Sequence, residues 1–330
     1  MRFPLRPQTL LDVLHRDEQS GAEAAQLLKR LAPQMVRRVL DLMQEAGTML
    51  DARNYTVGIT LVAREKLWQD AILIFDSMSH ARLSPNSYNY SATISACEKA
   101  SRWQCAVQLF QEMQCASLAD VVGFSSTISS CQKGSQWTAA LQLFGSMESA
   151  KVESNVYSYS AAISACEQGG HWTLGLALLF AMTTMRINPN GFSYSAAISA
   201  CGKNGQWQWA LQLFHLMSSR TTPNVVSMNA MISAYEKVGK WRKALDMFGD
   251  MSRMQICPDL ITYNAIISSC EKGARWPLAL HLFLQMSQKL RPDVTSYGAL
   301  VSSCEKDAAW QLALHLLRDF QEQKDESESK

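Results

Sequence analysis

Tryptophan recurs along this chain at an almost constant interval. Gaps of 35, 34, 35, 35, 34, 35 and 34 residues separate Trp68, Trp103, Trp137, Trp172, Trp207, Trp241, Trp276 and Trp310. Chance does not give eight tryptophans that spacing, and self-similarity at a period of about 20 to 50 residues is typical of repeat architectures. We therefore expect a stack of small repeated units in place of the two or three domains that 330 residues would otherwise suggest.

With each Trp at position 17 of its unit, the chain divides into seven full repeats and a partial eighth. The full repeats are residues 52–86, 87–120, 121–155, 156–190, 191–224, 225–259 and 260–293, and the partial repeat is 294–320, before a polar tail at 321–330. Residues 17–51 align more weakly, because Leu40 and Met43 match Phe75 and Met78 but Pro33 replaces the Trp. We interpret 17–51 as a degenerate repeat or cap, since terminal units of solenoids are atypical, and 1–16 as an N-terminal segment.

Two stretches of each repeat place apolar residues at helical spacing. The first has an aromatic residue at position 4, Ile at position 8 and Cys at position 11, as in Tyr194, Ile198 and Cys201. The second begins at the Trp and continues with the pattern A-L-x-L-F-x-x-M, and Pro-Asn or Pro-Asp follows it. One such hairpin cannot bury both of its apolar faces, so neighbouring repeats must stack into an all-α fold.

Each first helix also has a candidate capping residue. Position 3 is polar in most repeats, and from it we predict a helix that runs to about position 14, capped by Asn54, Asn89, Ser158, Ser193, Ser227, Thr262 and Ser296.

The cysteines do not indicate a metal site or a disulfide framework. No C-x-x-C pair occurs, and most cysteines recur at position 11, where we expect core packing in a reducing compartment: Cys97, Cys131, Cys166, Cys201, Cys270 and Cys304. The net charge of +2 and the pI near 8.0 favour a nucleic-acid partner only weakly. No apolar run approaches the length of a membrane span, so we expect no membrane partner.

The opposite face of the first helix is polar in every full repeat. Positions 5, 9 and 13 fall near one another at 100° per residue, and they hold Ser, Thr or Asn, then Ser or Thr, and then a cation or Gln168. Such a face could simply be the solvated side of an amphipathic helix. Its repetition along a solenoid instead suggests a surface that meets a polyanion with regularly spaced charges.

The string Tyr-Ser-Ala-x-Ile-Ser-Ala-Cys-Glu-Lys, the Trp, Ala-Leu-x-Leu-Phe-x-x-Met and the closing Pro-Asn or Pro-Asp resemble the pentatricopeptide repeat family. The resemblance covers about residues 52 to 320 and recurs in phase. It is distinct from the tetratricopeptide repeat, which carries its Trp in the first helix. The resemblance implies a right-handed superhelical solenoid of two-helix repeats of the P-type, about 35 residues long, that reads single-stranded RNA at about one base per repeat.

In this family the residue at position 5 and the last residue of the repeat together select the base. The resemblance therefore implies base selection by Thr56 with Asn86, Ser91 with Asp120, Ser125 with Asn155, Ser160 with Asn190, Ser195 with Asn224, Asn229 with Asp259, and Asn264 with Asp293. With the family's code and polarity, the predicted target is 5′-AGAAAUU-3′. The closing Asn and Asp could alternatively serve only as turn or cap residues after Pro.

Two further sets of residues complete the predicted interface. Base packing is expected from position 2, which holds Tyr88, Val122, Tyr157, Phe192, Val226 and Ile261. Phosphate contact is expected from position 13, which holds Arg64, Lys99, Lys133, Lys203, Lys237 and Lys272. Arg53 and Gly298 depart from the pattern at positions 2 and 5 of the two end repeats.

We expect neither catalysis nor a cofactor. No H-x-E motif, phosphate-binding loop or metal-ligand spacing occurs in the chain. The prediction is thus a monomeric RNA adaptor that acts in organellar RNA processing, stability or translation, with RNA-processing proteins as further partners. The family implies a chloroplast or a mitochondrion, although the N-terminus shows no clear transit peptide. The alternative is a scaffold that binds a protein or peptide in its concave groove.

Overall fold

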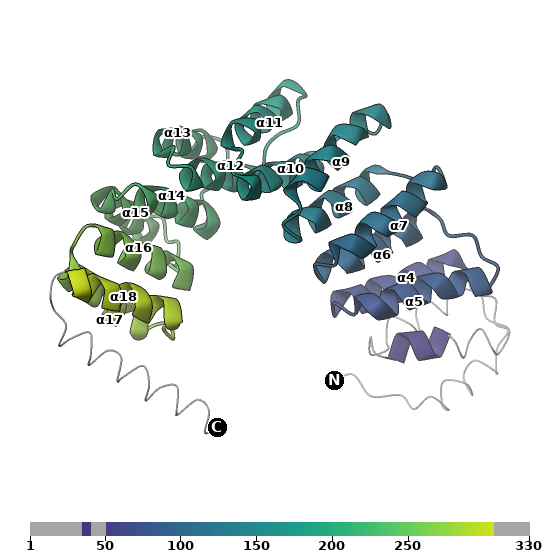
Figure 1. Ribbon diagram of the computed structural model, residues 1–330, viewed down its shortest axis with the longest axis horizontal. Coiled ribbons are helices and arrows are strands. Elements are labelled where there is room, and N and C mark those ends of the chain that lie inside the picture. Colours follow the sequence, from purple (N-terminus) through teal and green to yellow (C-terminus); the bar gives the residue numbers. More distant parts are fainter. Residues whose placement is uncertain (1–34, 41–50, 307–330) are drawn as a thin grey trace. The chain divides into compact units, whose positions relative to one another are not determined.

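The computed structural model of the protein describes residues 35–40 and 51–306. These residues form helices joined by short turns, so the all-α helical-repeat fold is confirmed. Pro33, Met43, Trp310 and the polar tail lie outside the described residues. Along the described chain the helices alternate in pairs (Figure 1).

The first helix of each pair begins at the residue with which a predicted repeat begins. These helices are α4 (Ala52–Arg64), α6 (Ser87–Lys99), α8 (Val121–Lys133), α10 (Val156–Gly169), α12 (Gly191–Lys203), α14 (Val225–Lys237), α16 (Leu260–Lys272) and α18 (Val294–Lys306). The division of the sequence into repeats is itself still a prediction.

The second helix of each pair begins at the repeated Trp, as the sequence predicts. These helices are α5 (Trp68–His80), α7 (Trp103–Cys115), α9 (Trp137–Ser149), α11 (Trp172–Thr184), α13 (Trp207–Ser218), α15 (Trp241–Arg253) and α17 (Trp276–Ser287). None of the helices described has the length and apolar character that crossing a bilayer requires.

The chain divides into two compact units, residues 1–165 and 166–330. In the first unit α4 packs on α6 and α6 packs on α8, and each of the second helices α5 and α7 packs on its own first helix and on that of the next repeat. In the second unit α12, α14, α16 and α18 pack in succession in the same way. Each unit is therefore a stack of helical hairpins.

Aromatic rings join one hairpin to the next. The Phe near the middle of a second helix meets the aromatic at position 4 of the following first helix edge to face, with ring centroids 4.8 Å apart for Phe75 and Tyr90 and 4.6 Å apart for Phe110 and Phe124. In the second unit the distance is 5.0 Å for Phe283 and Tyr297. Such pairs stabilise a fold beyond the burial of their surface, by about 0.5 to 1.5 kcal/mol each.

The predicted cap at position 3 is wrong. The cap is the closing Asn or Asp of the preceding repeat, whose side chain accepts a hydrogen bond from the backbone N–H at position 3, at 2.9 Å from Ser193 to Asn190 and 2.8 Å from Thr262 to Asp259. In several repeats the polar side chain at position 3 also accepts a hydrogen bond from the backbone N–H of the cap residue, as Asn89 does at 3.0 Å from Asn86. Position 3 is thus the inner member of a capping box, and the helix begins three residues earlier than predicted.

Candidate nucleic-acid interface

Stacking brings the position-5 side chain to the closing residue of its own repeat, which caps the next first helix. The Ser91 Oγ donates to Asp120 Oδ1 at 3.2 Å, and the Asn229 Nδ2 donates to Asp259 Oδ1 at 3.0 Å. The Asn264 Nδ2 donates to Asp293 Oδ1 at 3.2 Å, and the Ser125 Oγ lies 3.4 Å from Asn155 Oδ1 while it also donates to the Val121 carbonyl at 2.6 Å. Four of the predicted base-selecting pairs are therefore in direct contact, although their part in base selection is still a prediction.

Other position-5 hydroxyls donate to their own helix instead. Thr56, Ser160 and Ser195 each hydrogen bond the backbone carbonyl four residues earlier, at 3.0, 2.7 and 2.7 Å. A hydroxyl that donates in this way can still accept through its lone pairs, as the Thr56 Oγ1 does from Asn89 Nδ2 at 2.8 Å.

Position 5 lies deeper than the sequence pattern indicates. We expected positions 5, 9 and 13 to share one open polar face, but the side chains of Ser91, Ser160, Ser195 and Asn229 are buried. The reason is that adjacent first helices pack against each other, so position 5 faces the seam between two repeats. Any base edge that reaches these atoms must enter that seam.

A row of exposed apolar side chains borders the seam. All six predicted base-packing residues are more than half exposed, from 52% for Val122 to 74% for Tyr88 and Tyr157. Each lies in the first turn of its helix, three residues before position 5 and therefore on a neighbouring part of the helix surface. In RNA-binding modules generally, exposed aromatic side chains stack on bases and neighbouring hydrogen-bonding groups read the base edges.

Hydrogen bonds keep two of the closing carboxyls ionised. Burial alone would raise the pKa of Asp259, but bonds from the Thr262 backbone, from the Asn229 amide and from the Thr262 hydroxyl together lower it below its ordinary value. Burial opposes ionisation of Asp293 as well, and bonds from Thr295, Ser296 and Asn264 lower its pKa to about 2. At neutral pH both side chains are thus acceptors only.

Only part of the position-13 row is free to meet phosphate. Lys133, Lys203 and Lys272 pair with carboxylates of the preceding repeat, with Nζ to Oε1 distances of 2.8 to 2.9 Å. Within the described part of the chain, Arg64, Lys99 and Lys237 have no such carboxylate partner. Half of the predicted phosphate contacts therefore already have an anion beside them.

These carboxylates were not identified from the sequence. Each belongs to a Glu at position 12, and the oxygen that binds the Lys also accepts from a position-9 Ser, as Glu98 does from Ser129 at 2.8 Å. Glu167 binds Ser199 at 2.7 Å and Glu236 binds Ser268 at 2.9 Å in the same way. The available signal was a Glu at position 12, which occurs as Glu98, Glu167, Glu236, Glu271 and Glu305, and the first three of these stand one repeat before the three paired lysines.

The position-11 cysteines are buried, as predicted. Burial raises the pKa of the Cys97 thiol to about 12 and that of Cys131, Cys166, Cys201 and Cys270 to about 11, which keeps these groups protonated and unreactive. No group of His, Cys, Asp and Glu side chains suited to a metal ion occurs among the residues described.

Stacked helical hairpins define the class of helical-repeat solenoid proteins. Family models place the chain within it: the PPR repeat matches residues 88–118, 192–221 and 261–289, the PPR repeat family matches 223–272, and the pentatricopeptide repeat domain matches 38–100 and 142–204. The protein belongs to the pentatricopeptide repeat family.

Solved structures with the same fold include complexes with RNA. The pentatricopeptide repeat protein PPR10 of maize, in complex with an 18-nt psaJ RNA element, matches with a TM-score of 0.60 and 20% identity over 92% of this chain. A cysteine-to-serine form of that complex gives the same values. The PPR domain of Arabidopsis thaliana protein-only RNase P 1, in complex with tRNA, matches 53% of this chain at 14% identity and covers 94% of that domain, with a TM-score of 0.46.

The present chain spans about half the length of PPR10, because the match covers 52% of that protein. No curated protein sequence matched the chain.

Proposed function

We propose that this protein is a sequence-specific single-stranded RNA-binding protein that reads about one base per repeat. The observation that carries the proposal is the direct contact between position 5 and the closing residue in four repeats, beside an apolar residue at position 2 that is exposed in Tyr88, Val122, Val226 and Ile261. Family membership and the RNA complexes of PPR10 support the same reading. The protein acts as a non-catalytic adaptor in RNA processing, stability or translation within a chloroplast or mitochondrion.

Donor and acceptor chemistry supports the predicted target 5′-AGAAAUU-3′. Guanine and uracil both present a ring N–H at the Watson–Crick edge, and an ionised Asp can only accept, so Asp120, Asp259 and Asp293 suit G, U and U. Adenine presents a ring nitrogen acceptor next to an amino donor, which the amide of an Asn complements. The depressed pKa values of Asp259 and Asp293 keep both in the acceptor state.

Fluorescence anisotropy tests the proposal with two labelled RNAs of equal composition. We expect 5′-AGAAAUU-3′ to bind more tightly than its scrambled form at moderate salt, with both placed within the same unrelated flanking sequence. Equal affinity would refute the base assignment. No binding to either RNA would refute the RNA function and favour the scaffold that binds a protein in its concave groove.

A pair of substitutions tests the code itself. Asn229→Thr and Asn264→Thr together are expected to move the preference at the last two bases from U toward G, because the family associates Thr or Ser with Asp in reading G. Random-pool RNA selection on the wild type and on this variant measures the change. The first five selected bases act as the internal control, and a preference for U that persists at the last two would contradict the assignment.

A further inference from the structure

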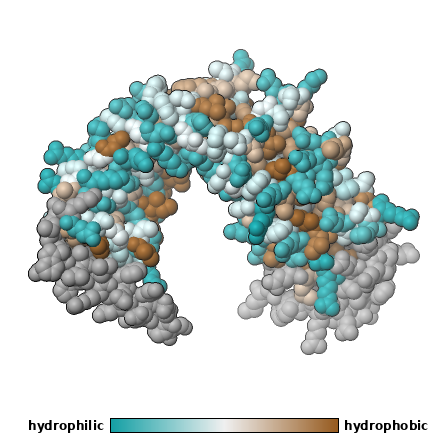
Figure 2. Space-filling view, viewed as in Figure 1, coloured by the Kyte–Doolittle hydropathy of each residue, from teal (hydrophilic) through white to brown (hydrophobic). Residues whose placement is uncertain are grey.

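The second helix α11 exposes an apolar ridge whose counterparts in α5, α7 and α15 are largely polar, and α17 repeats part of it with Leu278 and the exposed Leu284. In α11, Leu174, Ala177 and Phe180 are exposed and follow one another at intervals of three residues, and the helix contains no charged residue. The corresponding residues are Asp70, Leu73 and Asp76 in α5, Cys105, Gln108 and Gln111 in α7, and Lys243, Asp246 and Gly249 in α15. Figure 2 shows hydrophobic side chains gathered on the surface where α11 lies.

The apolar surface continues onto the next second helix. Trp209 of α13 has the same place in its repeat as Leu174 has in α11, and 43% of it is exposed. Equivalent positions of stacked repeats face the same side, and α11, α13 and α15 follow one another within the second unit (Figure 1). Phe180 and Leu174 are also 47% and 42% exposed. Exposed Trp and Phe side chains that gather on one face typically mark a protein interface.

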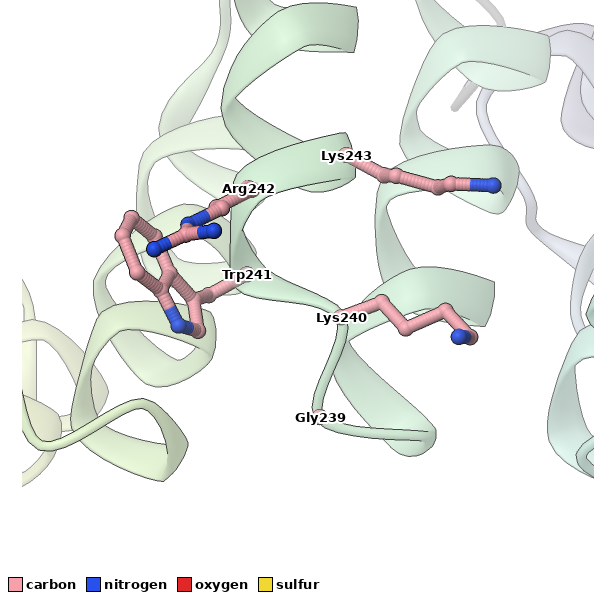
Figure 3. Close-up of a pocket in the computed structure, with 5 residues that line it drawn as sticks. All are labelled: Gly239, Lys240, Trp241, Arg242 and Lys243. Carbon is pink, nitrogen blue, oxygen red and sulfur yellow. The ribbon is translucent and has the colours of Figure 1, made fainter.

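A cluster of cations borders this surface on the side of α15. Lys240 and Lys243 extend in the same direction (Figure 3), and their Nζ atoms lie 4.7 and 4.3 Å from the ring centroid of Trp207 in α13. Arg242 extends the opposite way, over Trp241 at 5.1 Å, where Arg275 also lies at 5.3 Å. None of the four cations pairs with a carboxylate among the described residues. Lys240 and Lys243 are thus a pair of cations on the α13 side that has no carboxylate partner there.

We propose that the α11 ridge, Trp209, Lys240 and Lys243 form a docking site for an acidic amphipathic helix of a partner protein. The apolar face of that helix packs on Leu174, Phe180 and Trp209, and its carboxylates meet Lys240 and Lys243. The surface lies on second helices, apart from the position-2 and position-5 residues of the first helices, so RNA and this partner bind at the same time.

The charge of this surface favours an acidic partner helix over two other occupants, RNA and a second copy of the chain. RNA would suit the cations but would leave an uncharged helix with exposed Leu and Phe in contact with phosphates. A second copy of the chain would place another uncharged α11 against the cations. Successive second helices stand on the order of 10 Å apart, so the distance from α11 to α15 corresponds to about four turns of a partner helix.

Panning of a phage library of random 16-residue peptides tests the proposal, with the folded chain as the target and no RNA present. We expect enriched peptides to combine a net negative charge with large apolar residues at helical spacing. By fluorescence anisotropy, Leu174→Ser with Phe180→Ser is expected to weaken these peptides by at least about tenfold. Lys240→Gln with Lys243→Gln should weaken them too, with a steeper loss at low salt.

The matched control is Leu73→Ser in α5, where a Leu that is likewise 42% exposed lies on a helix with polar neighbours. It should leave peptide binding unchanged, and every variant should keep the wild-type circular dichroism and RNA affinity. The proposal would be overturned if the enriched peptides were neutral or basic, or if no peptide were enriched. It would also be overturned if the ridge and lysine variants bound the peptides as tightly as the wild type does. An RNA affinity that falls in the ridge and lysine variants would instead identify an RNA surface. A dimer seen by light scattering that these substitutions abolish would identify self-association.

Discussion

The closing Asn or Asp of each repeat holds a helix end and, in our proposal, reads a base. At Asp259, Oδ1 accepts from the Thr262 N–H, the Thr262 hydroxyl and the Asn229 amide. Capping requires only an acceptor oxygen, which Asn also provides, whereas base reading depends on whether the group can donate. A substitution that keeps the cap and changes the donor pattern therefore separates the two roles.

Asp259→Asn is that substitution. We expect the preferred sixth base to change from U to C, because cytosine presents a ring acceptor where uracil presents an N–H, and the new amide can donate. Stability should change little, since Asn and Asp cap helices about equally well. Binding to RNAs that differ only at the sixth base measures the preference, and urea unfolding checks the fold. An unchanged preference for U would show that Asp259 is a cap alone.

Acid should reveal the hydrogen bonds to Asp293. Its pKa is about 2 in the folded protein against an ordinary 3.8, so the folded state favours the charged form. The stability that this preference gives is fully present at pH values above the pKa of Asp293 in the unfolded chain, and it is lost as the pH falls from about 4 to 2. The stability of the wild type relative to Asp293→Asn, measured by urea unfolding, should be constant from about pH 7 to 5. Below about pH 4 the wild type should lose stability relative to the variant. A difference that changes near pH 6 would point to another group.

At the scale of elements, Gly202 allows two first helices to approach closely. A Cβ added there would lie 2.7 Å from the Cβ and 3.1 Å from the Cα of Ala234, so α12 and α14 would have to separate. We expect Gly202→Ala to lower the free energy of unfolding by about 1 to 3 kcal/mol, as overpacking of a core does. Urea unfolding measures the change.

Gly249 provides a matched control for that substitution. It lies within helix α15, and a Cβ added there would meet nothing within 4 Å. Gly249→Ala should therefore raise stability, by about 0.5 to 1 kcal/mol, because Ala loses less conformational freedom in a helix than Gly. If both substitutions shifted stability in the same direction, close helix packing at Gly202 could not explain the effect of Gly202→Ala on the free energy of unfolding.

The sequence predicts the helical elements well because their signals are local. The apolar spacing and the Trp fix the helix type and the start of each second helix. The cap was assigned wrongly because Asn190 and Ser193, three residues apart, can each accept from a backbone N–H, and only the fold shows that Asn190 has the extended backbone of a cap. The seam at position 5 and the Glu98 pairing depend on the packing of neighbouring repeats, which no pattern within one repeat contains.

At the scale of the whole molecule, the paired lysines change how RNA affinity should depend on salt. A net charge of +2 gives little general attraction, so the electrostatic share of binding must come from cations along the interface. Lys99 and Lys237 lack a carboxylate partner among the described residues, whereas Lys133 and Lys272 each have a Glu within 2.9 Å. A phosphate that approaches a paired lysine must compete with that Glu.

We therefore expect Lys99→Gln with Lys237→Gln to reduce the slope of log affinity against log salt by about 1.4, at about 0.7 for each lost contact with single-stranded RNA. Lys133→Gln with Lys272→Gln should reduce it by clearly less, although both pairs remove the same charge from the same position of the repeat. Conversely, Glu98→Gln with Glu236→Gln frees two lysines and should steepen the slope. Anisotropy titrations from low to moderate salt measure all three. Equal losses for the two lysine pairs, with no effect of the Glu substitutions, would mean that RNA displaces each Glu at no cost and that the pairing does not govern phosphate contact.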